Sequence, residues 1–369
     1  ILENQGLAVL PIANASLKEP ECKALVDQLA EKSDCRIFLN TTAFSIQSST
    51  GNADLSSQPD LLEPDALFSV NAPVLQVILA ANSEEDWQQH SQGLRARDIA
   101  MNIALPEMDG RIISRAVSFK GVAGRSERTE YDTVSYRLQH DRANFVAELA
   151  KRWAELSIKN NAEKRIALIL ANYPTRDGRI GNGVGLDTPA SAIEILNSMA
   201  HAGYSAEDIP TTGTALVHEL LGNITNDLSN LDLRPCQQSL AIEEYQQYFS
   251  ALPTECQQAV LERWGSAEQD PKVRSGRIMV AGIRLGETFI GIQPARGFNI
   301  DVAANYHDPD LVPPHSYLAF YFWLRHSYQV DAFIHIGKHG NLEWLPGKGL
   351  ALSNRCWPEI ALGPMPHLY

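Results

Sequence analysis

Short apolar runs that end in polar, glycine-containing loops recur along this chain of 369 residues. The clearest are residues 165–171, followed by the loop 172–187, and residues 331–336, followed by the loop 337–348. A run of about four to eight apolar residues between turn signals is typical of a strand buried on both faces, as in a parallel sheet. Ligands of open parallel sheets collect beyond the carboxyl ends of the strands. The sequence therefore predicts parallel strands whose following loops carry the function.

Segments with helical periodicity separate further apolar runs of the same kind. We expect additional strands at 7–12, 36–40, 73–80, 277–283 and 288–293, and helices at 19–32, 84–92, 141–158, 189–202 and 316–328. Ser83 is a suitable N-cap for the second of these helices. Strands that alternate with helices indicate a parallel sheet with helical cover. The predicted fold class is α/β, with parallel-sheet αβα units in two or more subdomains.

A polar segment after the helix at 141–158 indicates a domain boundary. We place a first α/β domain at 1–140, a connecting helix and linker at 141–164, and a second α/β domain at 165–369. The stretch at about 208–270 is polar and mostly helical in pattern, which predicts a largely helical insertion in the second domain. The chain begins with neither Met nor a signal-peptide pattern, so we expect it to be a fragment of a longer protein.

Composition excludes several classes of function. The chain has 31 basic and 44 acidic residues, a net charge of −13. This argues against nucleic acid as a partner, because phosphate binding depends on clustered Lys and Arg. No run approaches the ~18 to 20 apolar residues that span a bilayer, so we expect no membrane span. The 5 cysteines form no C-x-x-C pair and are odd in number, which indicates reduced thiols and a cytoplasmic protein.

The loop 337–348 concentrates groups that can hold a metal or move protons. His335, His339 and Glu343 are spaced four residues apart. On a continuous strand four residues cover ~13 Å, too far for two ligands of one ion, but Gly337 and Gly340 permit a turn that brings the three together. Two imidazoles and a carboxylate suit a divalent metal, and they can also transfer protons at neutral pH. The alternative for single residues is a core histidine at His335 and a solvated carboxylate at Glu343.

The loop 172–187 is the second candidate site. It lies between a predicted strand and helix, where backbone amides and a helix dipole receive anions. Its glycines run G-x-G-x-G, so they match neither the dinucleotide fingerprint nor a P-loop. Arg176 and Arg179 suit ligand carboxylates, because guanidinium binds them in pairs of hydrogen bonds. A surface loop with solvated charges is an equal alternative. The segments 121–128 and 305–315 are expected to be unspecific polar loops.

The two candidate loops resemble signatures of the CobN/magnesium-chelatase large-subunit family. The segments concerned are 171–190 (ANYPTRDGRIGNGVGLDTPA) and 335–348 (HIGKHGNLEWLPGK), and the last nine residues, ALGPMPHLY, fit as well. The resemblance extends over essentially the whole chain. Within the family, the motif GKHGNLEW is more similar to the sequences of the cobalt branch than to those of the magnesium branch. The resemblance implies the tetrapyrrole-binding subunit of an ATP-dependent metal chelatase.

For the cobalt branch, the resemblance implies insertion of Co²⁺ into hydrogenobyrinic acid a,c-diamide during cobalamin biosynthesis. It also implies two partner subunits, an AAA+ ATPase and a subunit with an integrin-like domain. These partners would use ATP and Mg²⁺, which agrees with the absence of a P-loop here. Two alternatives remain: a magnesium-chelatase-type subunit that binds protoporphyrin, and a non-catalytic tetrapyrrole-binding module.

The chemistry of metal insertion, taken together with the resemblance, suggests roles for individual residues. We hypothesise that His335, His339 and Glu343 hold the metal, with His339 and Glu343 taking part in catalysis. Glu343 is expected either to bind the ion or to accept a proton from the macrocycle. The expected substrate-binding residues are Arg176, Arg179, Asn182 and Lys338.

Overall fold

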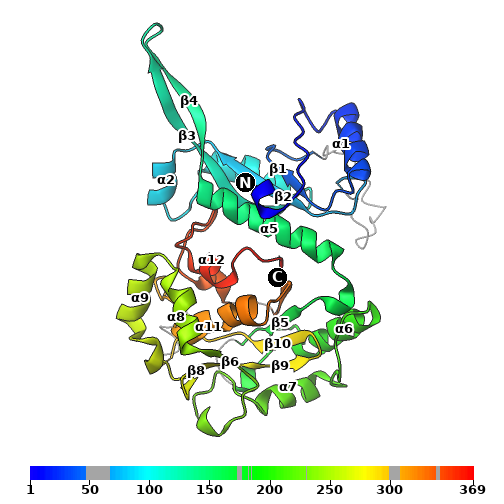
Figure 1. Cartoon of the computed structure of the whole chain (residues 1–369), viewed down its shortest axis with the longest axis vertical. Helices are drawn as coiled ribbons and strands as arrows, with labels where there is room; N and C mark the ends of the chain where they lie inside the picture. Colours follow the sequence, from blue (N-terminus) through cyan, green and yellow to red (C-terminus); the bar gives the residue numbers. More distant parts are fainter. Residues whose placement is uncertain are drawn as a thin grey trace. The chain divides into compact units, whose positions relative to one another are not determined.

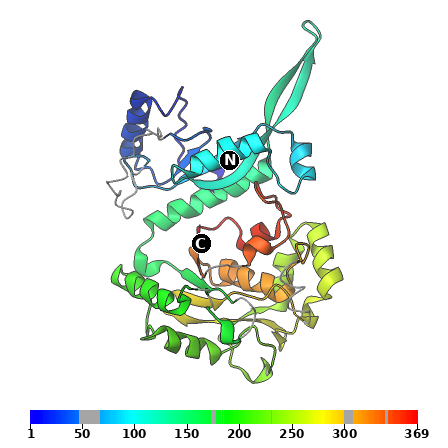
Figure 2. The ribbon, with the colours of Figure 1, turned by 180° about the vertical axis from the view of Figure 1, so that it is seen from behind.

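The chain divides into two compact units in the computed structural model. The structure describes residues 1–46, 67–172, 177–181, 183, 185–229, 231–298, 308–337 and 341–369. One unit comprises Ile1–Ser157 and Lys348–Leu352, and the other comprises Ile158–Gly347 and Ser353–Tyr369. The first unit thus ends inside the segment 141–164 that the sequence suggests as a connection. Figures 1 and 2 show both units from opposite sides.

The first unit is built on a four-stranded sheet in the order β1-β2-β3-β4. Its strands are β1 (Phe38–Asn40), β2 (Val74–Ala80), β3 (Ile112–Ser126) and β4 (Tyr131–Leu138). The first three are parallel, and β4 runs antiparallel to β3. Six of the seven residues of β2 are buried, which is why this strand reads as an almost continuous apolar run.

Helices cover this sheet, as the alternating pattern predicts. They are α1 (Pro20–Lys32), α2 (Glu84–Gln89), α3 (Ala96–Ile99), α4 (Leu105–Glu107) and α5 (His140–Ile158). Ser83 caps α2, because its side chain accepts a hydrogen bond from the amide of Asp86. The apolar face of α5 packs Leu149 and Ala150 against Leu75 of β2. The α/β class with parallel strand pairs is therefore confirmed.

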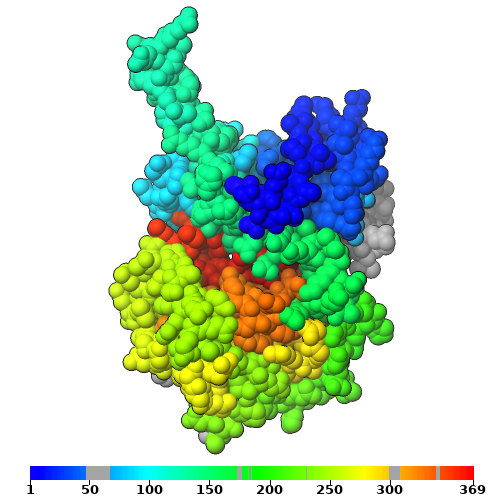
Figure 3. Space-filling view, viewed as in Figure 1, coloured from blue at the N-terminus to red at the C-terminus, as the bar shows by residue number. Residues whose placement is uncertain are grey.

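Two sequence expectations for this unit are wrong. Residues 7–12 form no strand, and Val9, Leu10 and Ile12 are 40%, 52% and 41% exposed. An apolar run does not become a strand without a neighbouring strand to receive its backbone hydrogen bonds. The expected loop at 121–128 instead belongs largely to β3, which forms a hairpin with β4. Figures 1 and 3 show this hairpin extending beyond the rest of its sheet.

The five residues Lys348–Leu352 complete the core of the first unit. The backbone oxygen of Ala351 accepts a hydrogen bond of 2.8 Å from the indole nitrogen of Trp87. The amide of Gly349 donates to the oxygen of Ser91 at 2.8 Å. Ala351 is buried in one apolar cluster with Trp87 and Phe119. This short strap therefore packs with residues more than 200 positions earlier in the sequence.

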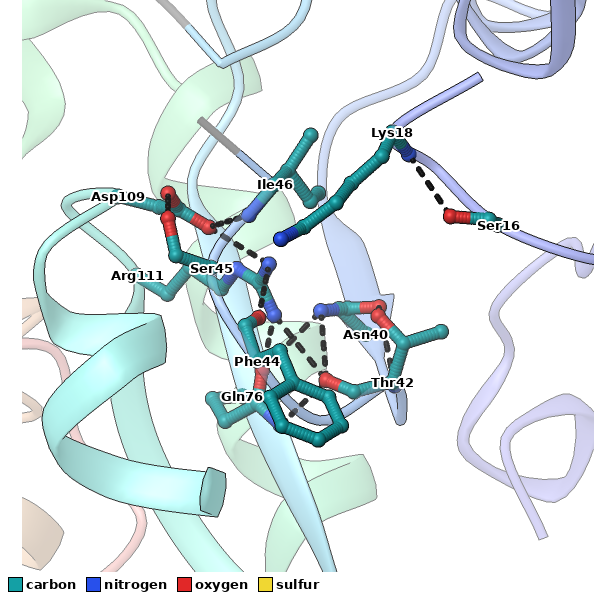
Figure 4. Close-up of polar contacts among 10 residues, drawn as sticks. All are labelled: Ser16, Lys18, Asn40, Thr42, Phe44, Ser45, Ile46, Gln76, Asp109 and Arg111. Atoms are coloured by element: carbon teal, nitrogen blue, oxygen red, sulfur yellow. Dashed lines mark hydrogen bonds and ion pairs between the residues drawn. The ribbon is translucent and has the colours of Figure 1, made fainter. Parts of the chain in front are cut away.

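A buried ion pair holds the loop after β1 to the start of β3 (Figure 4). The guanidinium of Arg111 contacts the carboxylate of Asp109 at 2.7 Å, and both side chains have no exposed surface. Arg111 also donates to the side chain of Gln76 at 2.8 Å and to the backbone oxygens of Thr42 and Phe44 at 3.1 and 3.0 Å. Such hydrogen bonds offset the cost of removing the two charges from water.

The second unit is built on a five-stranded sheet in the order β12-β11-β5-β10-β9. Its strands are β5 (Ile166–Leu170), β9 (Gly282–Leu285), β10 (Thr288–Ile292), β11 (Ala332–Ile336) and β12 (His367–Leu368). Strands β10, β5, β11 and β12 are parallel, and β9 is antiparallel to β10. Every residue of β5 and β10 is buried. These central strands explain the long apolar runs in the sequence.

The helices of the second unit pack on both faces of this sheet. They are α6 (Thr188–His201), α7 (Gly213–Leu221), α8 (Ile242–Ser250), α9 (Thr254–Trp264), α11 (His315–Phe322) and α12 (Trp357–Leu362). Helix α6 packs on β5 and β11, and α7 packs on β9. The aromatic helix α11 covers the opposite face, where it shares a core with Ala167, Phe289 and Phe333. Among the described residues, none of the helices combines the length and apolar character that crossing a membrane requires.

A small antiparallel sheet, β6-β8-β7, modifies the expected insertion. Its strands are β6 (Gln238–Ala241), β7 (Val273–Arg274) and β8 (Arg277–Val280). The segment 208–270 is therefore mostly helical but contributes one strand. The single strand expected at 277–283 is in fact two, because β8 and β9 belong to different sheets. Gly282 begins β9 at a point where a Cβ atom would lie 2.4 Å from the ring of Phe289.

Candidate functional site

Three parallel strands of the second unit end at the same edge of the sheet. The last residues of β5, β10 and β11 are Leu170, Ile292 and Ile336. The amide of Gln293 donates to the oxygen of Leu170 at 3.0 Å, and the amide of Ala171 donates to the oxygen of Ile336 at 3.0 Å. Both candidate loops therefore start from one hydrogen-bonded edge, as expected for parallel strands.

Gly337 marks the point where the chain leaves β11. A Cβ atom built on Gly337 would lie 2.3 Å from the Cβ of Ala171, well inside van der Waals contact. Only glycine allows the two strand ends to approach this closely. The close approach fixes where the loop with His339 begins.

We expect Gly337→Ala to reduce the free energy of unfolding by about 1–3 kcal/mol, because the added methyl group must push two packed strand ends apart. Urea denaturation followed by circular dichroism measures the change. Gly178→Ala is the matched control, since a Cβ there meets no atom within 4 Å. Equal stability losses in the two variants would contradict this account of Gly337.

Asn341 anchors the far end of the same loop. Its side-chain oxygen accepts hydrogen bonds from the hydroxyl of Tyr317 at 2.7 Å and from the amide of Gln293 at 2.8 Å. Its side-chain nitrogen donates to the backbone oxygen of Pro294 at 2.8 Å. The residues on either side of 338–340 are thus held to the ends of β11 and β10.

Behind this anchor lies a buried polar chain. The amine of Lys272 donates to the side-chain oxygen of Asn226 at 2.7 Å, and Asn226 donates to the backbone oxygen of Gln293 at 2.8 Å. Burial lowers the pKa of Lys272 to about 8, against the opposing effect of nearby Asp270. The edge of the sheet is therefore supported from within by polar contacts as well as by apolar packing.

His335 lies inside β11 and faces α11. It is 8% exposed, and both ring nitrogens have partners. Its Nε2 is 3.1 Å from the hydroxyl of Tyr321, and its Nδ1 is 2.7 Å from Nε2 of His367. Burial, and next the neighbouring His367, lowers the pKa of His335 well below the usual value. To bind a metal, His335 would have to give up one of these two hydrogen bonds.

Glu343 is exposed, in a single helical turn, Leu342–Trp344. Its Oε1 accepts a hydrogen bond of 2.9 Å from the hydroxyl of Tyr369. The ring of Tyr369 lies 6.1 and 5.9 Å from the rings of His335 and His367, measured between centroids. The structure therefore places Glu343 and His335 on either side of Tyr369.

His367 makes the free energy of unfolding depend on pH. Burial lowers the pKa of His367 from 6.5 to about 4. The unfolded chain therefore binds a proton first, and this contribution to stability is present above pH 6.5 and lost as the pH falls towards 4.

The free energy of unfolding of the wild type is expected to fall between pH 7 and pH 5. In His367→Gln we expect this fall to be smaller by about 2 kcal/mol, because the variant lacks the group whose pKa differs between the folded and unfolded states. Urea denaturation at the two pH values measures it. His201→Gln, at the exposed end of α6, is expected to leave the pH dependence unchanged. The same pH dependence in His367→Gln and wild type would contradict the prediction.

The described part of the loop after β5 includes a buried side chain without a partner. Asn172 is 5% exposed, and neither polar atom of its side chain has a partner in the described part of the chain. Asp177 pairs with Arg234 at 2.7 Å, and Arg179 is exposed. An unsatisfied buried amide next to the sheet edge suits a polar ligand, because such a group costs free energy when it lacks a partner.

Four predicted site residues lie outside the described residues: Arg176, Asn182, Lys338 and His339. In the part of the chain that is described, no three His, Cys, Asp or Glu side chains group as a metal site. The sequence reasoning missed the residues that surround His335 and anchor the loop. These are Gln293, Tyr317, Tyr321, Asn341 and His367. Asn341 and His367 do lie in the two motifs 335–348 and 361–369, but their spacing alone indicates no contact.

Comparison with known proteins shows which family this chain belongs to. A model of the CobN/Magnesium Chelatase family matches residues 1–369. Aerobic cobaltochelatase subunit CobN of Pseudomonas aeruginosa is 57% identical over 368 residues, which are 100% of this chain and 29% of that protein. The corresponding subunit of Sinorhizobium sp. is 45% identical over 368 residues, 28% of its length. The chain therefore spans less than a third of these relatives.

More distantly similar proteins include a magnesium-chelatase subunit and a solved structure. Magnesium-chelatase subunit ChlH of Oryza sativa is 28% identical over 371 residues, 100% of this chain and 25% of that protein. A solved structure, the catalytic subunit of cobaltochelatase from Mycobacterium tuberculosis, has a TM-score of 0.79 and 34% identity. The match covers 99% of this chain and 30% of that one. With a family model that matches every residue, this chain belongs to the CobN/magnesium-chelatase family.

Proposed function

We propose that this chain is part of the corrinoid-binding subunit of a cobaltochelatase, which inserts Co²⁺ into hydrogenobyrinic acid a,c-diamide in cobalamin biosynthesis. The observation that carries the proposal is the loop after β11. The chain is fixed on either side of this loop, at Gly337 and Asn341, and the loop carries His339 and Glu343. The whole chain that contains it is 57% identical to a CobN subunit.

The chemistry of insertion suits these residues. The ion must lose water, and the macrocycle must lose two protons from its ring nitrogens. Imidazole is a suitable ligand for Co²⁺, and a carboxylate can bind the ion or accept a proton. We assign the metal to His339 and Glu343. His335 was also expected to bind the metal, but its two hydrogen-bonded nitrogens favour a different role.

The proposed contacts to the macrocycle come from Arg176, Arg179, Asn182 and Lys338. Their cationic and amide groups match the carboxylate and amide side chains of the corrinoid. Asn172 supports this assignment, because its buried side chain lacks a partner at the start of the same loop.

The proposal includes partners that supply energy. An AAA+ ATPase subunit and a subunit with an integrin-like domain would use ATP and Mg²⁺, and this chain would bind neither. We place the complex in the cytoplasm, in keeping with five cysteines that are all free thiols.

The test uses the full-length subunit with its partner subunits and ATP. Cobalt insertion into hydrogenobyrinic acid a,c-diamide is followed by its absorbance change, and binding of that compound and of protoporphyrin is compared by fluorescence quenching. We expect insertion of Co²⁺ and tighter binding of the corrinoid. Tighter binding of protoporphyrin with insertion of Mg²⁺ would indicate the magnesium-chelatase reaction. Binding without insertion of either metal would indicate a non-catalytic tetrapyrrole module.

A further inference from the structure

Three rings form a continuous hydrogen-bonded chain near the end of β11, where the loop 337–348 (the site loop) begins. The hydroxyl of Tyr321 lies 3.1 Å from Nε2 of His335, and Nδ1 of His335 lies 2.7 Å from Nε2 of His367. Tyr321 and His335 are fully or almost fully buried, whereas His367 is half-buried on β12. The chain therefore runs from the interior of the second unit to its surface.

The Tyr321 hydroxyl also has side-chain hydrogen bonds with Tyr317 and Gln293. A hydroxyl hydrogen can rotate between its partners, and a neutral imidazole can carry its hydrogen on either nitrogen. In the arrangement that the relay uses, Tyr321 donates to Nε2 of His335, and Nδ1 of His335 donates to Nε2 of His367. Nδ1 of His367 then carries a hydrogen.

Burial favours the neutral form of both imidazoles. It lowers the pKa of His367 to about 4, and burial and next the neighbouring His367 lower the pKa of His335 well below its usual value. A neutral imidazole can take up a proton at one nitrogen while it releases one from the other. A positively charged imidazole already holds both protons and can accept none.

The 2.7 Å between Nδ1 of His335 and Nε2 of His367 is the length of a hydrogen bond. The two histidines therefore form a hydrogen-bonded pair in this structure.

We propose that Tyr321, His335 and His367 form a proton relay that carries protons released at the site loop to the solvent. The inference rests on the proposed chelatase function, because exchange of Co²⁺ for two ring N–H protons produces the protons that must leave. Tyr321 adjoins the anchor of that loop, since Gln293 is hydrogen-bonded both to Tyr321 and to Asn341.

One transfer balances as follows. The hydroxyl of Tyr317, a hydrogen-bond partner of Tyr321, gives its proton to the Tyr321 oxygen and regains one from the site loop, while the Tyr321 hydroxyl proton moves to Nε2 of His335. His335 passes its Nδ1 proton to Nε2 of His367, and His367 releases its Nδ1 proton to water. One proton enters, one leaves, and every group ends neutral. Rotation of the hydroxyl and exchange of the imidazole protons then restore the starting arrangement.

The test uses the full-length subunit in the complete complex, with Co²⁺ and hydrogenobyrinic acid a,c-diamide. Tyr321→Phe keeps the ring and removes the hydroxyl, and His367→Ala removes the imidazole at the half-buried end. We expect both variants to lower the turnover rate of insertion at least about tenfold, within the range of proton-transfer contributions. The dissociation constants for Co²⁺ and for the corrinoid are expected to stay within about twofold.

Added imidazole separates a relay from a structural role. It is expected to restore insertion by His367→Ala as its concentration rises, because free imidazole can supply the proton-transferring group that the variant lacks. The control is His201→Ala, whose exposed ring on α6 bonds only to Asn197 of its own helix. His201→Ala and wild type are expected to show full activity and no gain from imidazole.

Four results would overturn the relay. They are full activity in Tyr321→Phe and His367→Ala, loss of activity that imidazole does not restore, weaker Co²⁺ binding in either variant, or an equal gain from imidazole in His201→Ala. A wild-type complex that inserts no Co²⁺ would instead reject the proposed function, and the relay with it.

Discussion

Replacing Glu343 by glutamine is expected to lower the rate of Co²⁺ insertion by a factor of about 10² to 10⁴. Glutamine keeps the size of the side chain and can still accept the hydrogen bond from Tyr369. It loses the negative charge that binds the ion and the basicity that accepts a proton. The loss is therefore expected in turnover, measured by absorbance in the complete complex.

Binding of the corrinoid separates this effect from misfolding. The dissociation constant of Glu343→Gln for hydrogenobyrinic acid a,c-diamide, from fluorescence quenching, is expected to match that of wild type. Glu262→Gln is the control, because Glu262 is an exposed carboxylate on α9. Full insertion activity in Glu343→Gln would remove Glu343 from the catalytic site and leave the fold and family unaffected.

The second large effect concerns stability. Arg111→Met is expected to lower the free energy of unfolding by about 3–5 kcal/mol, because it leaves the carboxylate of Asp109 buried without its cation. The pair is fully buried, and Arg111 also bonds Gln76 and the loop after β1 (Figure 4). Urea denaturation followed by circular dichroism measures the loss.

Two controls make this prediction specific. Arg36→Met removes one partner of an exposed pair with Asp34, and we expect a loss below about 1 kcal/mol. The double variant Arg111→Met, Asp109→Leu removes both buried charges, and it is expected to recover part of the stability. A loss for Arg111→Met no larger than that for Arg36→Met would show that the buried pair contributes little.

The sequence predicts best the elements whose signals are local. The signals for the strands β2, β5 and β11 and for the Ser83 cap each span only a few consecutive residues, and all four features are confirmed. The hairpin of β3 and β4 was missed because no side chain of β4, and none of β3 beyond Phe119, is buried. A pattern of burial cannot indicate a stretch of strand that has no buried face.

For the candidate site as well, the sequence predicts the local features and misses the contacts between distant residues. His335 and Glu343 stand out in the sequence because their chemistry is concentrated in one loop. Tyr321 and His367 do not, since they meet His335 from 14 positions before it and 32 positions after it. Such contacts depend on which strands pair and on which face each residue lies. Whether His339 and Glu343 bind the metal stays a prediction.

The strap Lys348–Leu352 affects how the protein is made as well as how it is held together. The first unit otherwise ends at Ser157, yet Ala351 fills its core and receives the Trp87 hydrogen bond. A ribosome adds the intervening ~190 residues at about 5–20 residues per second. The first unit therefore lacks this part of its core for roughly 10–40 s after Ser157 has been added. During synthesis the N-terminal unit cannot finish folding before the second unit has emerged almost entirely.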